Sequence, residues 1–559
     1  MYDRERILSF LDTIFERLEK SRDTAVLQEL KGGQAVCATG GELATLIRAA
    51  RAFLRAQGVS KGERVGLLAA NSIRWVAMDL AILAEGLTAV PLYARQAPGE
   101  LVAMMKDCAP SLVCCGDAAL RDSIAQHWPD APRMPIFEEI FATSAPGDLP
   151  PRVVLAAGDA VAIVYTSGTS GEAKGVVLGA GGVDFILNAT AQRLNVLMAG
   201  HQGQERVFHY PPFCFAASWI MLLTCLQRGN LLMMAMDLGT LAADMRASAP
   251  HYFLNVPVLL ERMRAGIDEQ LRKTGGLANL IYTRAREAWL ARDRGERAAL
   301  GGAWLALARA IVFPTIRKKM TGTSLRALIC GSAPLARETQ LFFMMLGIPV
   351  LQVYGLTETT AICTMDDPSR VEPGRVGPAI AGIEMKLGEN DEILVRGPNL
   401  FLGYWKREQA TAEAMRDGWF HTGDQGEVNE GGRWRIAGRI KNLIVLSSGH
   451  NVAPEPIEDE MLRLLPDAQQ VVLVGHGRPF VGAVVSGSPT PEQVQFAMEE
   501  VNRELPHYKR VRAFHIHAEP FTVESGMLTI NGKLKRDVIA TRLREPIEMM
   551  YARQEVRAG

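Results

Sequence analysis

The part of the chain with the most evident chemistry is a short segment rich in glycine and hydroxyl residues that ends in a lysine. Glycines let backbone N–H groups turn toward a polyanion, hydroxyls add donors and a lysine adds positive charge, so this composition favours phosphate binding. Ala173 stands where a Walker A loop counted from Gly168 needs glycine, and the segment contains no Gly-X-Ser-X-Gly nucleophile elbow. A glycine-rich turn taken alone is as often structural, so the rest of the chain has to decide. The segment reads Val164-Tyr165-Thr166-Ser167-Gly168-Thr169-Ser170-Gly171-Glu172-Ala173-Lys174.

Two other motifs, at 331–334 and 354–359, follow apolar runs in the same way, and three more come further along the chain. In open α/β sheets, ligands bind beyond the carboxyl ends of the strands, so we expect the loops that follow these runs to contribute to a binding site. In chain order the motifs are Gly331-Ser332-Ala333-Pro334, Tyr354-Gly355-Leu356-Thr357-Glu358-Thr359, Gly418-Trp419-Phe420-His421-Thr422-Gly423-Asp424, Gly438-Arg439-Ile440-Lys441-Asn442 and Leu528-Thr529-Ile530-Asn531-Gly532-Lys533-Leu534-Lys535-Arg536.

The elements that must position these motifs alternate between strand and helix. Apolar runs at 64–70 and 88–93 flank a helical pattern at 75–85, which predicts a βαβ unit and a buried, mostly parallel sheet. Apolar spacing also predicts a helix over 4–18. We therefore predict an α/β fold with a large N-terminal domain of βαβ-built sheets packed with helices, residues 1–440, and a small α+β domain, residues 441–559. Further expected elements are buried strands at 161–165, 325–330 and 349–354, helices over 262–320 and a hairpin over 427–436.

Composition excludes several classes of protein. The 559 residues are 48% hydrophobic and 22% charged, which is typical of an ordered core rather than a disordered chain. Lys+Arg and Asp+Glu both number 61, so no basic excess suggests a nucleic-acid partner. The eight cysteines show no metal spacing, which favours a reducing compartment. We see no secretory signal and expect a cytoplasmic protein without stable membrane insertion, because the most apolar stretch, 219–236, is interrupted by polar residues.

In this order, the motifs resemble those of the adenylate-forming superfamily, which includes acyl-CoA synthetases, peptide-synthetase adenylation domains and luciferases. The resemblance covers nearly the whole chain, from 61–65 onward. It implies activation of a carboxylic acid by ATP and Mg²⁺ to an acyl-adenylate, with release of pyrophosphate and transfer of the acyl group to the thiol of CoA. It also implies that the C-terminal domain is mobile. Residues 257–330, 443–449 and 521–524 are most similar to long-chain fatty acyl-CoA synthetases, so the expected acid is a medium- or long-chain fatty acid.

The resemblance assigns roles residue by residue. It gives catalysis to Lys533, Lys174 and Glu358, Mg²⁺ binding to Thr166 and Glu358, and the hinge between domains to Lys441. The expected path of the thiol runs along Ser448, Gly449 and His450, and the expected acyl pocket includes Phe213, Cys214, Phe215 and Trp219. The expected ATP-binding residues are Thr166, Ser167, Gly168, Thr169, Ser170, Gly171, Lys174, Gly331, Ser332, Ala333, Pro334, Tyr354, Gly355, Thr357, Asp424, Arg439 and Lys533.

The chain departs from the family pattern at four places. Ala173 replaces a usual proline, Leu178-Gly179-Ala180 stand where the family often has Thr-His, Cys214 stands near the place of a usual histidine, and Asn442 replaces a usual aspartate. Two alternative functions stay open. One is a ligase that delivers the acyl group to the phosphopantetheine of an acyl carrier protein. A basic patch for the CoA 3′-phosphate would argue against this alternative, and its candidates are Arg439, His507, Lys509 and Arg510. The other is a non-catalytic binding protein, which would have no reason to keep Lys174, Glu358, Asp424, Arg439 and Lys533 together.

Overall fold

The computed structural model describes residues 10–143, 149–167, 173–296, 300–528 and 533–558. The chain divides into two compact units whose segments alternate between residues 386 and 435. The first unit comprises Met1–Met385, Val395–Phe420 and Asn429–Trp434, and the second comprises Lys386–Leu394, His421–Val428 and Arg435–Gly559. The boundary that the sequence predicts at Lys441 stays a prediction.

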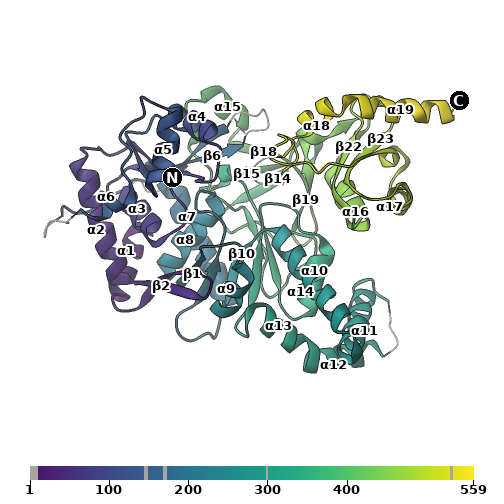
Figure 1. Ribbon diagram of the computed structural model, residues 1–559, viewed down its shortest axis with the longest axis horizontal. Helices are drawn as coiled ribbons and strands as arrows, with labels where there is room; N and C mark the ends of the chain where they lie inside the picture. The colour runs from purple at the N-terminus through teal and green to yellow at the C-terminus, as the bar shows by residue number, and fades with distance from the viewer. Residues whose placement is uncertain (1–9, 144–148, 168–172, 297–299, 529–532, 559) are drawn as a thin grey trace. The chain divides into compact units, whose positions relative to one another are not determined.

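The first unit contains a sheet in the order β13-β12-β11-β10-β8-β9-β1-β2 (Figure 1). Strands β8, β10, β11 and β12 run parallel, so their carboxyl ends meet at one edge of the sheet. The strands predicted at 325–330 and 349–354 are confirmed as β11 and β12. The strand bounds are β1 Ala25–Lys31, β2 Gln34–Thr39, β8 Arg206–His209, β9 Leu231–Ala235, β10 Tyr252–Asn255, β11 Ala327–Cys330, β12 Val350–Tyr354 and β13 Thr364–Met365.

A further sheet of the first unit has the order β16-β7-β6-β4-β3-β5. Helix α3, Ile73–Ala84, connects β3 to β4, which pair in parallel with Val65 opposite Ala89. This confirms the predicted βαβ unit. Strands β6 and β7 form an antiparallel hairpin around residues 168–172. The strand bounds are β3 Arg64–Leu68, β4 Thr88–Leu92, β5 Leu112–Cys115, β6 Ala160–Ser167, β7 Ala173–Gly179 and β16 Gly403–Tyr404.

The helices of the first unit carry their apolar sides toward these sheets. Helix α1 begins at Phe10 in the described chain, and residues 4–9 of the helix predicted over 4–18 lie outside the described residues. Helix α2 begins after a capping box between Thr39 and Glu42, which satisfies backbone donors of its first turn. The bounds are α1 Phe10–Lys20, α2 Gly40–Ala56, α4 Pro98–Cys108, α5 Ala118–His127, α6 Phe137–Phe141, α7 Ala180–Leu197, α8 Ala216–Arg228, α9 Leu241–Ser248, α14 Arg337–Met345, α15 Glu408–Ala414 and the 3₁₀ turn η2 Thr357–Thr359.

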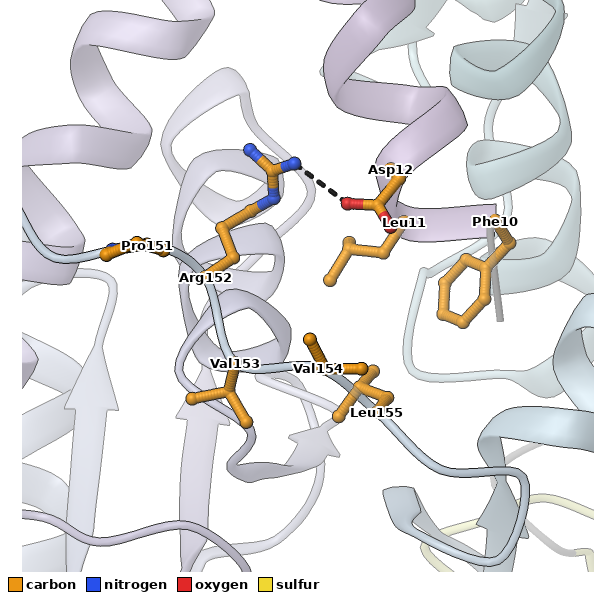
Figure 2. A pocket seen from close by; sticks show the side chains of 8 residues that line it. All are labelled: Phe10, Leu11, Asp12, Pro151, Arg152, Val153, Val154 and Leu155. Atoms are coloured by element: carbon orange, nitrogen blue, oxygen red, sulfur yellow. Dashed lines mark hydrogen bonds and ion pairs between the residues drawn. The ribbon is translucent and has the colours of Figure 1, made fainter. Parts of the chain in front are cut away.

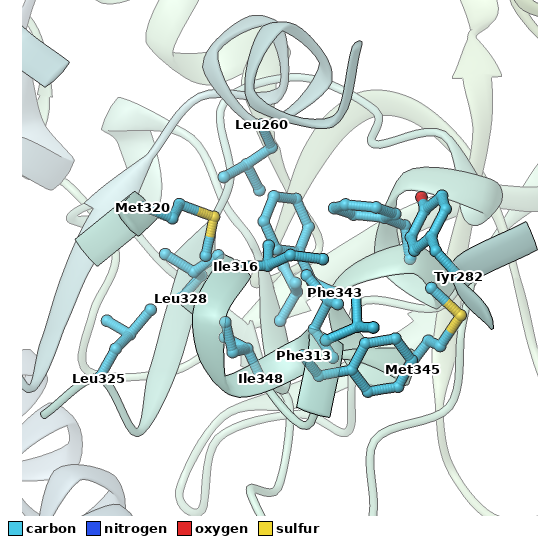
Figure 3. Close-up of a cluster of buried hydrophobic side chains, with 14 of the residues drawn as sticks. Leu260, Tyr282, Phe313, Ile316, Met320, Leu325, Leu328, Phe343, Met345 and Ile348 are labelled. Carbon is cyan, nitrogen blue, oxygen red and sulfur yellow. The ribbon is translucent and has the colours of Figure 1, made fainter. Parts of the chain in front are cut away.

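The helical stretch predicted over 262–320 is confirmed for the described residues and begins earlier, at Pro257, whereas residues 297–299 lie outside the described residues. Its inner side chains pack with those of β11 and α14 in one hydrophobic cluster, in which Phe313, Leu328 and Phe343 are at most 2% exposed (Figure 3). Burial of this apolar surface attaches the helices to the sheet. The bounds are α10 Pro257–Thr274, α11 Gly276–Asp293, α12 Gly301–Leu307, the π-helical turn η1 Ala308–Val312 and α13 Phe313–Thr321.

Shorter strands follow from residue 384, and the predicted hairpin over 427–436 is confirmed as β18 and β19. A sheet in the order β14-β15-β18-β17, with β19 beside β18, precedes the ladders β20-β21 and β22-β23-β24. The bounds are β14 Glu384–Leu387, β15 Glu392–Arg396, β17 Met415–Arg416, β18 Trp419–Val428, β19 Trp434–Arg439, η4 Ile440–Asn442, β20 Ile444–Val445, β21 Asn451–Val452, α16 Glu455–Leu464, β22 Ala468–Val474, β23 Val481–Gly487, α17 Pro491–Glu504, η5 His507–Lys509, β24 Val511–His517, α18 Arg536–Arg542 and α19 Arg544–Ala558.

The cysteines are free thiols, and most of them are buried. Cys37 on β2 is exposed, Cys214 is half-buried, and the other six are buried. Burial raises the pKa of Cys108 to about 11 and that of Cys115 and Cys225 to about 12. A protonated, buried thiol is a small apolar side chain rather than a nucleophile. No helix in the described ranges is long and apolar enough to span a membrane.

A buried carboxyl group lies between α3 and α8. The indole Nε1 of Trp219 donates to Asp79 Oδ2 at 2.9 Å, and Asp79 Oδ1 has no partner among the described residues. Burial raises the pKa of Asp79 to about 7 from 3.8, although the hydrogen bond from Trp219 opposes the shift. The folded protein therefore holds this proton above the pH at which the unfolded chain releases it, and the contribution of Asp79 to stability falls as pH rises from about 4 to about 7.

We expect Asp79→Asn to become more stabilising, relative to wild type, as pH rises. The amide oxygen still accepts from Trp219, but asparagine carries no charge to bury. Between pH 5 and pH 8 the difference in unfolding free energy should shift by about 2–3 kcal/mol in favour of the variant. Thermal or urea unfolding of both proteins across this range measures the shift. A difference that does not change with pH would show that Asp79 is ionised in the folded protein throughout.

Candidate active site

The glycine-rich segment is held by the hairpin of β6 and β7. Thr166 lies opposite Lys174 in the register of the two strands, and its hydroxyl contacts the Lys174 carbonyl oxygen at 3.5 Å. These two residues therefore lie at the two ends of the predicted phosphate loop. Gly168, Thr169, Ser170 and Gly171 lie outside the described residues, and Ser167 is described only as the last residue of β6.

A tyrosine connects this hairpin to Glu358. The ammonium Nζ of Lys174 lies 5.2 Å from the centre of the Tyr404 ring, and the Tyr404 hydroxyl donates to Glu358 Oε1 at 2.9 Å. Tyr404 reaches this position because β16 pairs with β7, with Tyr404 opposite Val176. Glu358 sits in η2, directly after β12. The structure thus brings Lys174 and Glu358, which the sequence places in separate motifs, against one aromatic ring.

Sequence analysis did not identify Tyr404. The segment Gly403-Tyr404-Trp405 is short and contains no charged residue, so neither its composition nor its spacing indicates chemistry. Its pairing with β7 is a tertiary contact. The ammonium group of Lys174 over the ring face and the hydrogen bond from the hydroxyl to Glu358 together hold the Tyr404 side chain in place.

Two glycine turns lie at the carboxyl edge of the larger sheet, after the neighbouring parallel strands β11 and β12. A Cβ at Gly331 would lie 2.6 Å from Val353 Cγ2, and a Cβ at Gly355 would lie 2.3 Å from the Ala361 carbonyl oxygen. Both positions therefore need glycine. Ser332 has a φ of 72° and, with Ala333 and Pro334, is exposed. Tyr354 is buried and Thr357 opens η2. The expected adenine-binding motifs thus share one edge.

Gly355→Ala should disrupt this edge. The contact at 2.3 Å is with backbone, so the turn must shift and the tyrosine and glutamate on either side of it must move. We expect at least a tenfold loss of kcat/KM for ATP and a lower melting temperature. Gly99→Ala is the matched control, because nothing lies within 4 Å of the added Cβ. Equal activity of the two variants would contradict this role for Gly355.

The four acyl-pocket candidates differ in their surroundings. Phe213 is fully buried, with its ring stacked 4.8 Å from that of His209, and Trp219 is buried against Asp79. Phe215 and Cys214 are half-buried, and the Phe215 ring lies 6.0 Å from that of Tyr93. Burial raises the pKa of Cys214 to about 12, so its thiol stays protonated. Phe213 and Trp219 are therefore packed in the interior, while Phe215 and Cys214 retain accessible surface, and the acyl pocket itself stays a prediction.

In the second unit, Asp424 and Arg439 form an ion pair. Arg439 Nε lies 2.6 Å from Asp424 Oδ1, and Asp424 is 4% exposed because it faces inward from the middle of β18. Desolvation lowers the pKa of Lys533, as does the charge of Arg439, whereas Asp424 raises it. Desolvation also lowers the pKa of Lys441 to about 8, with contributions from Arg439 and Lys533. Three cations and one carboxylate thus influence one another, which suits this cluster to binding an anion.

The segment predicted to line the thiol path is the turn between β20 and β21. Gly449 has a φ of 81°, and Ser448 Oγ lies 3.0 Å from His450 Nδ1. The His450 ring stacks on that of Tyr508, with centroids 4.5 Å apart. Lys509 Nζ lies 5.8 Å from the centre of the Tyr508 ring. Sequence analysis missed Tyr508, which gives the turn a flat support.

A hollow of about 280 Å³ lies elsewhere in the first unit, between α1 and residues 151–155 (Figure 2). Its lining is mainly apolar, with one ion pair of 2.8 Å between Arg152 and Asp12. None of its lining residues is a predicted site residue. The hollow is therefore separate from the predicted ATP and acyl sites.

Comparison with known proteins identifies the family to which this fold and these motifs belong. Residues 14–405 match the family model described as AMP-binding enzyme, and residues 441–555 match the model of the AMP-binding enzyme C-terminal domain. The chain belongs to the AMP-binding enzyme family. This confirms the resemblance to adenylate-forming enzymes that the ordered motifs indicate.

Among curated proteins, the chain is similar to long-chain-fatty-acid–CoA ligases. It is 30% identical to the ligase FadD15 of Mycobacterium tuberculosis, over 97% of this chain and 96% of the relative. It is 26% identical to the ligase ACSBG2 of Gallus gallus, over 90% of this chain and 76% of the relative.

Solved structures confirm the fold class. O-succinylbenzoate CoA synthetase from Bacillus subtilis, in complex with AMP, aligns with a TM-score of 0.73 at 19% identity, covering 94% of this chain and 97% of that chain. A Mycobacterium tuberculosis fatty acyl CoA synthetase aligns with a TM-score of 0.65 at 21% identity, covering 97% and 99%.

Proposed function

We propose that this protein is an AMP-forming ligase that activates a medium- or long-chain fatty acid with ATP and transfers the acyl group to CoA. The observation that carries the proposal is the arrangement of Lys174, Tyr404 and Glu358 beside the hairpin of the phosphate loop. Family membership and the names of the curated relatives support the substrate class.

In the first half-reaction, a carboxylate oxygen of the acid attacks the α-phosphorus of ATP. A new P–O bond forms, the bond to the bridging α–β oxygen breaks, and pyrophosphate leaves. Lys174 and the backbone of the loop after Thr166 would hold the β- and γ-phosphates, because a cation and N–H donors stabilise the charge that develops there. The turns at Gly331 and Gly355, which close packing against Val353 and Ala361 restricts to glycine, would border the adenine at the edge of the sheet.

Mg²⁺ fits the donor set of the first unit. The Glu358 carboxylate, held by Tyr404 through one oxygen, and the Thr166 hydroxyl are hard oxygen ligands of the kind that Mg²⁺ prefers. When bound, Mg²⁺ would neutralise part of the charge of the triphosphate. The role of the protein is to hold these oxygens in place before ATP arrives.

The charged cluster of the second unit would hold the ribose and the reacting groups. Asp424 would accept hydrogen bonds from the ribose hydroxyls, with Arg439 fixing the carboxylate through their 2.6 Å ion pair. Lys533 would stabilise the negative charge shared by the carboxylate and the α-phosphate during attack. Desolvation and the positive charge of Arg439 disfavour the protonated form of Lys533 when ATP is absent, so binding of a polyanion would stabilise the protonated lysine.

In the second half-reaction, the thiol sulfur of CoA attacks the acyl carbonyl, the carbonyl–phosphate bond breaks and AMP leaves. By analogy with the family, Lys441 would be the hinge about which the C-terminal domain turns between the two steps. Ser448, Gly449 and His450 would then line the path of the thiol. The exposed turn and its support on Tyr508 favour this assignment.

Pyrophosphate release tests the proposal. The full chain is incubated with ATP, Mg²⁺ and a panel of acids from acetate to long-chain fatty acids, with aryl acids included, each with and without CoA. We expect turnover that requires CoA and is greatest with medium- or long-chain acids, with formation of acyl-CoA and AMP.

Other outcomes have defined meanings. Acid-dependent pyrophosphate release that CoA does not accelerate would overturn the CoA step and favour transfer to a carrier protein. An aryl acid as the best substrate would overturn the fatty acid. No pyrophosphate release with any acid of the panel, from a folded protein, would contradict ligase activity and favour the non-catalytic alternative.

A further inference from the structure

Exposed apolar side chains are concentrated on the helices between Pro257 and Thr321. Of the seventeen exposed large hydrophobic residues in the described part of the chain, six lie in this stretch, which is little more than a tenth of the sequence. Single exposed leucines are ordinary, but a concentration of this kind indicates an interaction surface. The six are Val258 (55% exposed), Leu277 (71%), Leu280 (46%), Leu300 (75%), Leu307 (38%) and Ile311 (57%).

The helix formed by α12, η1 and α13 is apolar on both its inner and its outer side. Its inner side chains, among them Phe313, Ile316 and Met320, point into the hydrophobic cluster (Figure 3). A helix at the surface of a globular protein normally carries polar residues on its opposite side. Here the outer side instead exposes Leu307 and Ile311 together with the small residues Ala303, Ala306 and Ala310.

The exposed charges of this helix are all positive. Residues 301–321 contain four Lys and Arg and no Asp or Glu. Arg309, Lys318 and Lys319 are exposed, and none has an ion pair in the ranges that the structure describes. Over 257–321 there are thirteen Lys and Arg against six Asp and Glu, a net charge of +7 in a chain whose formal charge is zero.

The apolar and basic side chains share one side of the helix. Leu307, Ile311 and Lys318 are spaced by four and seven residues, which places them in a row along the helix, and Leu300 lies directly before its first turn. We call this row, with Leu300 before it and Lys319 next to its last residue, the outer stripe. It is apolar over two turns and basic at its C-terminal end.

Two backbone features coincide with the outer stripe. The π-helical turn η1 spans Ala308–Val312 and so includes Ile311, and π turns are frequent at functional sites. Leu300 has a φ of 55°, a conformation in which asparagine or glycine is more favourable than leucine. A leucine in this conformation and exposed leucines are unfavourable for a protein alone in water, so they suit contact with something outside the fold.

We propose that the outer stripe docks the protein onto the surface of an anionic lipid bilayer. Leucine and isoleucine side chains would enter the boundary between headgroups and acyl chains, while Lys318 and Lys319 would contact lipid phosphates. Charge complementarity favours this occupant over a second copy of the chain, which would bring two strongly positive surfaces together. Docking would be peripheral, because no helix in the described ranges can span a bilayer.

Docking would also place the enzyme where its substrate is most concentrated. Long-chain fatty acids partition into bilayers because burial of each CH₂ is favourable. This consequence rests on the proposed function, whereas the docking itself does not. A vesicle-binding measurement therefore tests the stripe independently of ligase activity.

The test is flotation of the full chain with vesicles of phosphatidylcholine alone or with 30% phosphatidylglycerol. We expect at least fivefold more protein on the anionic vesicles in 0.1 M salt and loss of this difference in 0.5 M salt. Leu307→Gln/Ile311→Gln and Lys318→Gln/Lys319→Gln should each reduce binding about tenfold. Phe496→Gln, which removes a 56% exposed apolar side chain from α17, is the matched control and should bind like wild type.

Each alternative result overturns the proposal. Wild type that does not float, or variants that float as well as wild type, would exclude the stripe as a docking site. A dimer that Leu307→Gln/Ile311→Gln dissociates, without vesicle binding, would assign the stripe to contact between copies. The variants should keep wild-type pyrophosphate release in vesicle-free solution. Ligase activity that is absent in every protein, with vesicle binding intact, would overturn the proposed function alone.

Discussion

Lys533→Ala should slow formation of the acyl-adenylate at least about 100-fold, which corresponds to about 3 kcal/mol of lost transition-state stabilisation. A lysine at this position stabilises charge that is shared between carboxylate and α-phosphate only during attack. The loss should therefore fall on kcat more than on the KM for ATP. Burst measurements of pyrophosphate release in single turnovers report this step.

The second half-reaction separates this role from a structural one. Given a synthetic acyl-adenylate and CoA, Lys533→Ala should form the thioester at close to the wild-type rate. Lys535→Ala, two residues further on and exposed, is the matched control and should affect neither step. If Lys533→Ala impairs both half-reactions equally, the role assigned to Lys533 is wrong.

Glu358→Gln should lower kcat/KM for ATP about 100-fold and raise the Mg²⁺ concentration needed for half-maximal rate. Glutamine keeps the shape and can still accept the hydrogen bond from Tyr404, but it lacks the charge that a divalent cation requires. Titration of Mg²⁺ at saturating ATP measures the second effect.

Tyr404→Phe is the informative control for Glu358. It removes the hydroxyl that holds Glu358 Oε1 but keeps the ring beneath Lys174. We expect a loss of about tenfold, smaller than that of Glu358→Gln, because the carboxylate is released but not removed. A Glu358→Gln variant whose Mg²⁺ dependence equals that of wild type would contradict metal binding by this residue.

Much of the first unit could be predicted from local pattern. The run of strand, helix and strand from 64 to 93 is confirmed because apolar periodicity and the need to bury both faces of a parallel sheet act in the same direction. The motifs at Gly331 and Gly355 share one edge for the same reason, since adjacent parallel strands end together. The helices over 262–320 are confirmed because that segment has few β-branched residues.

The parts that could not be predicted depend on contacts between distant residues. Tyr404 acts through β16, a two-residue strand whose pairing with β7 leaves no signal in the sequence. Phe213 and Phe215 are the same residue type only two positions apart, yet Phe213 is fully buried and Phe215 is half-buried. The environment of Asp79 could not be predicted either. An aspartate in an apolar helix indicates burial but does not identify Trp219 as its hydrogen-bond partner.

The distribution of the cysteines makes the unmodified chain suitable for site-directed chemistry. A thiol with a pKa near 12 is less than about one part in 10⁴ thiolate at pH 7.5, so Cys115 and Cys225 should be inert toward maleimides and disulfide reagents, and burial also keeps reagents from the other buried cysteines. Within the described chain, Cys37 is the one exposed cysteine, and it lies on β2, the last strand of its sheet. A single fluorophore could therefore be attached without engineering, and consumption of free CoA thiol could be followed continuously over a background of about one protein thiol per chain.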